Sequence, residues 1–74
     1  MILYIPVVDG KYLIKEGRTV ATFLYSDSER LIAENGGVGR VKSVEAVSLT
    51  RAEIRRRRIY RVSAYDFHII DVDG

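Results

Sequence analysis

The chain has 74 residues, no cysteine, a single histidine and a net charge of +2, and 30% of its residues are charged. This length fits a single domain spanning residues 1–74, and the lack of cysteine excludes disulfides and a Cys/His zinc site. The apolar start of the chain has no basic segment and contains Pro6, and no run approaches the roughly 20 apolar residues of a membrane span. We therefore expect a cytoplasmic protein with neither a signal peptide nor a membrane contact.

The polar residues are those typical of heat-adapted proteins. Glutamine is absent, Asn35 is the only asparagine, and nine of the twelve basic residues are arginine. Few thermolabile amides and many charges that can form surface networks are common in thermophiles. We therefore predict a thermophilic protein.

Two runs of β-branched and aromatic residues flank Asp9-Gly10 near the start of the chain. This dipeptide favours a type I′ turn, because both central residues of that turn need a positive φ. The turn predicts a hairpin with Val8 opposite Lys11. Pro6 cannot donate a ladder hydrogen bond, so it indicates an edge strand or a bulge. Alternation then predicts a wholly apolar core face made of Leu3, Ile5, Val7, Tyr12 and Ile14.

A second turn at Glu16-Gly17 leads into a third predicted strand, Arg18–Ser26. Ser26 and Glu29 have the spacing of a capping box, which predicts the start of a short helix. This helix is expected to end at Asn35, just before a glycine.

The second half of the chain predicts strand, helix and strand. Val41–Leu49 is rich in β-branched residues and favours a strand, although the three-residue spacing of its valines also allows a helix. Thr50 and Glu53 form a second capping-box pattern, which predicts a helix to about Arg58. Ile59–Val72 reads as one long strand, bent or broken near Asp66.

The predicted fold class is a small α+β domain in the order β-β-β-α-β-α-β. We expect a mixed, mostly antiparallel sheet of about five strands, covered mainly on one face by two short helices. The later strands carry apolar residues on both faces, more than two short helices can cover. We therefore expect a homo-oligomer, most simply a homodimer.

Positive charge is concentrated in residues 51–61, which hold six arginines and one glutamate and so sum to +5, leaving −3 for the rest. Guanidinium groups match phosphate geometry, and nearby tyrosines could stack on bases. Helical spacing would align Arg51, Arg55 and Arg58 in one stripe. We therefore predict a small nucleic-acid-binding protein that contacts DNA or RNA through Arg51, Arg55, Arg56, Arg57, Arg58, Arg61 and Tyr60.

The alternative is a non-enzymatic protein-interaction or assembly subunit. The arginines would then form a structural ion network, including an i,i+4 pair between Glu53 and Arg57, or a docking surface for an acidic protein.

Other motifs give weaker signals. The glycine-rich segment 35–40 follows the first helix and reads as a helix end and loop, rather than a phosphate-binding nest. His68 reads as a partly buried strand residue, rather than as a ligand or a general base. No serine lies in a nucleophile-elbow context. We expect no enzymatic activity, no metal, no cofactor and no small-molecule substrate, since so short a chain rarely shapes a pocket.

Overall fold

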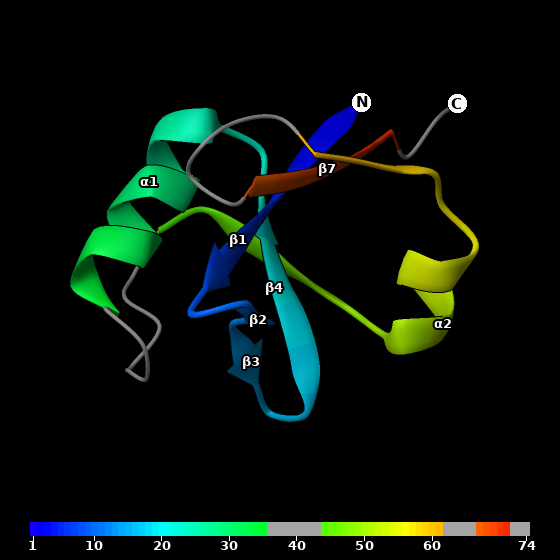
Figure 1. The fold of residues 1–74 in the computed structure, drawn as a ribbon, viewed down its shortest axis with the longest axis horizontal. Helices are drawn as coiled ribbons and strands as arrows, with labels where there is room; N and C mark the ends of the chain where they lie inside the picture. Colours follow the sequence, from blue (N-terminus) through cyan, green and yellow to red (C-terminus); the bar gives the residue numbers. More distant parts are fainter. Residues whose placement is uncertain (36–43, 62–66, 72–74) are drawn as a thin grey trace.

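The computed structural model describes residues 1–35, 44–61 and 67–71, and Figure 1 shows how its elements are arranged. Two helices accompany a set of short strands. The strands are β1 (Ile2–Val8), β2 (Lys11–Tyr12), β3 (Ile14–Lys15), β4 (Arg18–Thr22), β5 (Ala46–Leu49), β6 (Ile59–Arg61) and β7 (Phe67–Asp71), and the helices are α1 (Tyr25–Glu34) and α2 (Arg51–Arg55).

The strands form an antiparallel sheet in the order β3-β4-β1-β7-β6, with β2 paired to β1 and β5 paired to β4. Every strand pair among the described residues is antiparallel. A sheet of this kind with two segregated helices is a small α+β fold, so the predicted fold class is confirmed.

Both predicted turns are present. Val8 pairs with Lys11, and Asp9 and Gly10 have φ values of 51° and 75°. These two positive angles are those of a type I′ turn, which fits the right-handed twist of the strands. Glu16-Gly17 repeats the same geometry between β3 and β4.

The predicted core face is correct along β1 and wrong at Ile14. Ile14 is 57% exposed, whereas its neighbour Leu13 is only 6% exposed. Alternation itself holds, because Leu13 lies in the cluster of Val8 on the other face and Ile14 lines the same pocket as Tyr12. Ile14 fails only as a core residue, since it stays exposed at that pocket. The Leu13 carbonyl accepts a hydrogen bond from the Val20 N–H at 3.0 Å, and the side chain turns beneath α1.

Pro6 lies in a central strand, so the expectation of an edge strand is wrong. It pairs with Phe67 of β7 on one side of β1. On the other side of β1, Tyr4 pairs with Thr22 of β4, and Val7 pairs with Tyr12 of β2. Among the described residues Pro6 has no strand partner on that side, which is where the missing N–H of a proline costs least.

The core is two-sided, and the two helices lie on opposite sides of the sheet rather than mainly on one (Figure 1). Leu31 of α1 packs with Val8 and Val20 on one face. The other face carries a second cluster that includes Leu3, Ile5, Ala21 and Ile70. Successive β1 side chains point to opposite faces, which explains why nearly all of this strand is buried.

The helix α1 does not begin with the predicted capping box. Its N-cap is Leu24, with no side-chain capping bond, and Ser26 lies exposed in the first turn. Ser28 is instead the buried serine, and its hydroxyl is hydrogen-bonded to that of Thr22. This contact anchors α1 on β4, so a tertiary hydrogen bond replaces the local cap. The C-cap is Asn35, as predicted.

The last predicted strand is two strands. β6 and β7 pair antiparallel, with Ile59 opposite Ile70, so the chain reverses direction between Arg61 and Phe67. The predicted bend or break near Asp66 falls within residues 62–66, which lie outside the described part. In Val41–Leu49 the described strand starts at Ala46, and residues 36–43 lie outside the described part.

Candidate nucleic-acid interface

A complete capping box fixes the start of α2. The Glu53 N–H donates to Thr50 Oγ1 at 3.2 Å, and the Thr50 N–H donates to Glu53 Oε2 at 2.7 Å. Ile54 is 6% exposed and anchors the helix on the protein. The prediction of this cap is confirmed, and it places the arginines of α2 on the outward side of a fixed turn.

The helix is shorter than predicted, and this divides the arginine cluster. The C-cap of α2 is Arg56, so Arg58 lies beyond the helix and cannot share a helical stripe with Arg51 and Arg55. Those three, together with Arg56 and Arg57, are all exposed. Tyr60 and Arg61 belong to β6, and their side chains lie outside what the structure describes.

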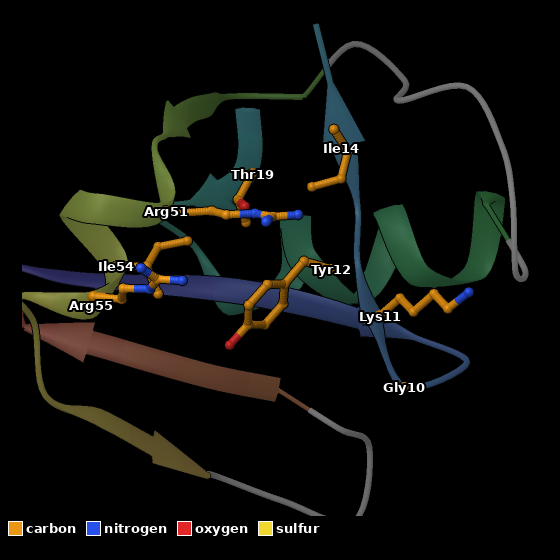
Figure 2. Close-up of a pocket in the computed structure, with 8 residues that line it drawn as sticks. All are labelled: Gly10, Lys11, Tyr12, Ile14, Thr19, Arg51, Ile54 and Arg55. Carbon is orange, nitrogen blue, oxygen red and sulfur yellow. The ribbon is translucent and has the colours of Figure 1, made fainter. Parts of the chain in front are cut away.

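Arg51 and Arg55 lie beside a pocket formed between α2 and the first hairpin (Figure 2). Its volume is about 560 Å³, within the range of about 300–1,000 Å³ common for ligand pockets. This short chain therefore forms a concavity of the size of a ligand pocket. The lining residues are Gly10, Lys11, Tyr12, Ile14, Thr19, Arg51, Ile54 and Arg55.

The pocket has cationic side chains, and none of the described residues that line it is acidic. Lys11, Arg51 and Arg55 contribute three positive charges. In the described part of the chain, none of these three side chains makes a hydrogen bond or an ion pair. Their charges are therefore available to a bound anion.

Glu53, the acidic residue of α2, contacts Arg18 and does not line this pocket. Glu53 Oε2 lies 3.5 Å from an Arg18 guanidinium nitrogen, in place of the predicted pair with Arg57. The hydrogen bond from the Thr50 backbone, followed by the charge of Arg18, lowers the pKa of the Glu53 carboxyl. A contribution from Arg56 acts in the same direction. Within the described part of the chain, the interactions of Glu53 do not involve Arg51 or Arg55.

Arg56 and Arg57 line a different depression. Its volume is about 220 Å³, and it also includes Leu49, Glu53 and Ile70. The Arg56 Nε donates to the Ala52 carbonyl at 3.4 Å. Four consecutive arginines therefore serve at least two separate surfaces, because successive residues of a helical turn point in different directions.

Sequence analysis missed the contribution of the first hairpin. Lys11 and Tyr12 lie about forty residues before α2 in the chain and reach the same pocket. Tyr12 Oη is hydrogen-bonded to His68 Nδ1 at 2.7 Å, and burial raises the pKa of the Tyr12 hydroxyl. Alternation did place Tyr12 on the inward face, but no local signal connects it to α2.

The remaining motifs stay outside this site. His68 is a partly buried strand residue, as predicted. Residues 36–40 of the glycine-rich segment lie outside the described part. The described residues hold no group of three or more His, Cys, Asp or Glu side chains that could bind a metal ion. Neither described helix has the length and apolar character needed to cross a membrane.

Comparison with family models, with curated proteins and with solved structures gave no match for this chain.

Proposed function

We propose that the protein binds nucleic acid, and that Arg51, Arg55 and Lys11 contact its phosphates. The observation that carries this proposal is the set of three cationic side chains around one pocket whose described lining contains no acidic residue. None of the described residues that line the pocket is acidic, and the carboxylate of α2 is hydrogen-bonded to Thr50 and paired with Arg18. The arrangement therefore favours an external anion.

The chemistry of the three side chains suits a polyanion. A guanidinium group keeps its charge at any physiological pH and can bind two phosphate oxygens at once. Arg51 and Arg55 are four residues apart on α2, so they lie on the same side of the helix. Lys11 comes from the hairpin turn and adds a charge from a second element. Two adjacent phosphates of one strand could thus be held together.

Fluorescence anisotropy with labelled oligonucleotides tests this proposal. We expect binding at about 50 mM salt that weakens strongly by about 200 mM, because phosphate contacts release counterions. Three phosphate contacts predict that a plot of the logarithm of the binding constant against the logarithm of the salt concentration has a slope of roughly −2 to −3. The double substitution Arg51→Ala and Arg55→Ala should reduce this slope by between about one and two units.

Arg56→Ala is the matched control. It removes the same charge from the next position in the chain, but Arg56 lies at the other depression, beside Glu53. We expect Arg55→Ala to weaken binding clearly more than Arg56→Ala does. Equal effects of the two substitutions would show that binding depends on the net charge of the protein and not on the pocket. The absence of binding at low salt would refute the proposal and favour an acidic protein as the partner of this surface.

A further inference from the structure

The pocket between α2 and the hairpin combines an apolar part with a charged part. Tyr12, Ile14 and Ile54 supply apolar surface, and Ile14 is 57% exposed. Lys11 and the two arginines supply charge. In the view of Figure 2 the Tyr12 ring lies between Arg55 and Lys11. A ligand that fills this pocket can therefore place an apolar portion and a negative charge against matching residues.

The Tyr12 ring is held in a defined orientation. Its hydroxyl is hydrogen-bonded to His68, and the two rings meet edge to face, with centroids 5.4 Å apart and an interplanar angle of 83°. Since the hydroxyl is occupied by this contact, the side chain offers its ring rather than a polar group to the pocket. An ordered aromatic ring is the usual platform on which an unpaired base stacks.

We infer that the pocket receives an unpaired nucleobase, and that the protein prefers single-stranded nucleic acid to a duplex. This inference rests on the proposed function. Bases of a duplex are stacked within the helix, so a duplex could use the three cations but not the apolar surface. A single strand can turn one base onto Tyr12 while its phosphates stay beside the arginines. The single strand therefore satisfies both parts of the pocket.

A comparison of three oligonucleotides of about twelve nucleotides tests the inference. They are a single strand, its duplex, and an abasic strand with the same number of phosphates. We expect the normal single strand to bind about 5- to 100-fold more tightly than the abasic strand, which is the contribution expected of a stacked base. The duplex should bind with an affinity close to that of the abasic strand.

Variants of Tyr12 locate the effect. Tyr12→Phe keeps the ring and should keep most of the preference for the normal strand, whereas Tyr12→Ala should abolish it. Circular dichroism establishes whether each variant is folded. If Tyr12→Ala does not fold, Ile14→Ser serves instead, because Ile14 is exposed and its replacement should reduce the preference without unfolding the chain.

The outcomes separate the inference from the proposed function. If the duplex or the abasic strand binds as tightly as the normal single strand, the inference is overturned and phosphate binding stands. If the preference survives Tyr12→Ala, or Ile14→Ser where that variant serves, the base lies elsewhere and the inference is also overturned. If none of the three oligonucleotides binds, both the inference and the proposed function fail.

Discussion

Tyr12 and His68 are 56 residues apart in the chain, and Tyr12 Oη lies 2.7 Å from His68 Nδ1. The bond joins the short strand β2 to the last described strand, β7. Its two partners come from opposite ends of the sequence, so it forms only when the sheet is assembled. The same contact fixes the aromatic ring that faces the cationic pocket.

Tyr12→Phe should lower the free energy of unfolding by about 1 kcal/mol, because the substitution removes one partly buried hydrogen bond. Tyr25→Phe is the control, since the Tyr25 hydroxyl makes no hydrogen bond within the described residues, and its effect should stay within about 0.5 kcal/mol. Urea denaturation measures both values. Equal stability of the two variants would contradict the assignment of a stabilising role to this bond.

Thr50→Ala should destabilise the protein by about 1 kcal/mol, because it removes the side-chain acceptor of the α2 capping box. Ser26→Ala should have an effect near zero, since Ser26 is exposed and caps nothing. The two sites have the same sequence pattern and differ only in the structure. Thermal or urea denaturation measures the stability of both variants. If Ser26→Ala destabilised the protein as much as Thr50→Ala, the conclusion that Ser26 does not cap α1 would be wrong.

The ionised Glu53 carboxylate should stabilise the fold at neutral pH. Its pKa is lowered in the folded protein, mainly by the Thr50 backbone hydrogen bond and then by Arg18. A lowered pKa means that the stabilisation is fully present above the ordinary value of 4.5 and is lost as the pH falls through the folded-state value. NMR titration should give a Glu53 pKa below 4.5, and Arg18→Ala should raise it. A Glu53 pKa at or above 4.5 would contradict this assignment.

Homodimerisation stays a prediction, now with a different basis. The two faces of the sheet each contribute to a core cluster, so uncovered faces no longer motivate it. Instead, β5 and β6 each have one strand partner among the described residues, and unpaired strand edges favour pairing with another chain. Light scattering should give twice the 8.4 kDa mass of one chain. A single-chain mass at micromolar concentration would exclude the dimer.

Local turn chemistry explains why much of the fold could be predicted. Asp9-Gly10 and Glu16-Gly17 adopt the positive φ values that such dipeptides favour, and both hairpins follow from them. The failures come from contacts made at long range. Ile14 lies at the same pocket as Tyr12 but stays exposed, whereas Leu13 is buried on the other face beside Val8 and Leu31 of α1. Ser28 rather than Ser26 anchors α1 because Thr22 lies beside it in space.

The site could be predicted only in part. The exposed arginines of α2 follow from composition and capping, but the loss of Arg58 from the predicted stripe follows from the early end of the helix at Arg55. Lys11 and Tyr12 reach the pocket through the sheet topology, which no local pattern encodes. The residues that give the pocket its apolar character were therefore the ones that sequence analysis did not assign to a site.

NMR titration of the isotope-labelled protein with a single-stranded oligonucleotide tests the central claim most directly. The account predicts that the largest shift changes fall on the backbone and side chains of Lys11, Tyr12, Arg51 and Arg55, and that Arg56 and Ile70 change little. Changes concentrated on Arg56, Arg57 and Ile70 instead, or no changes at low salt, would contradict the assignment of the pocket as the nucleic-acid interface.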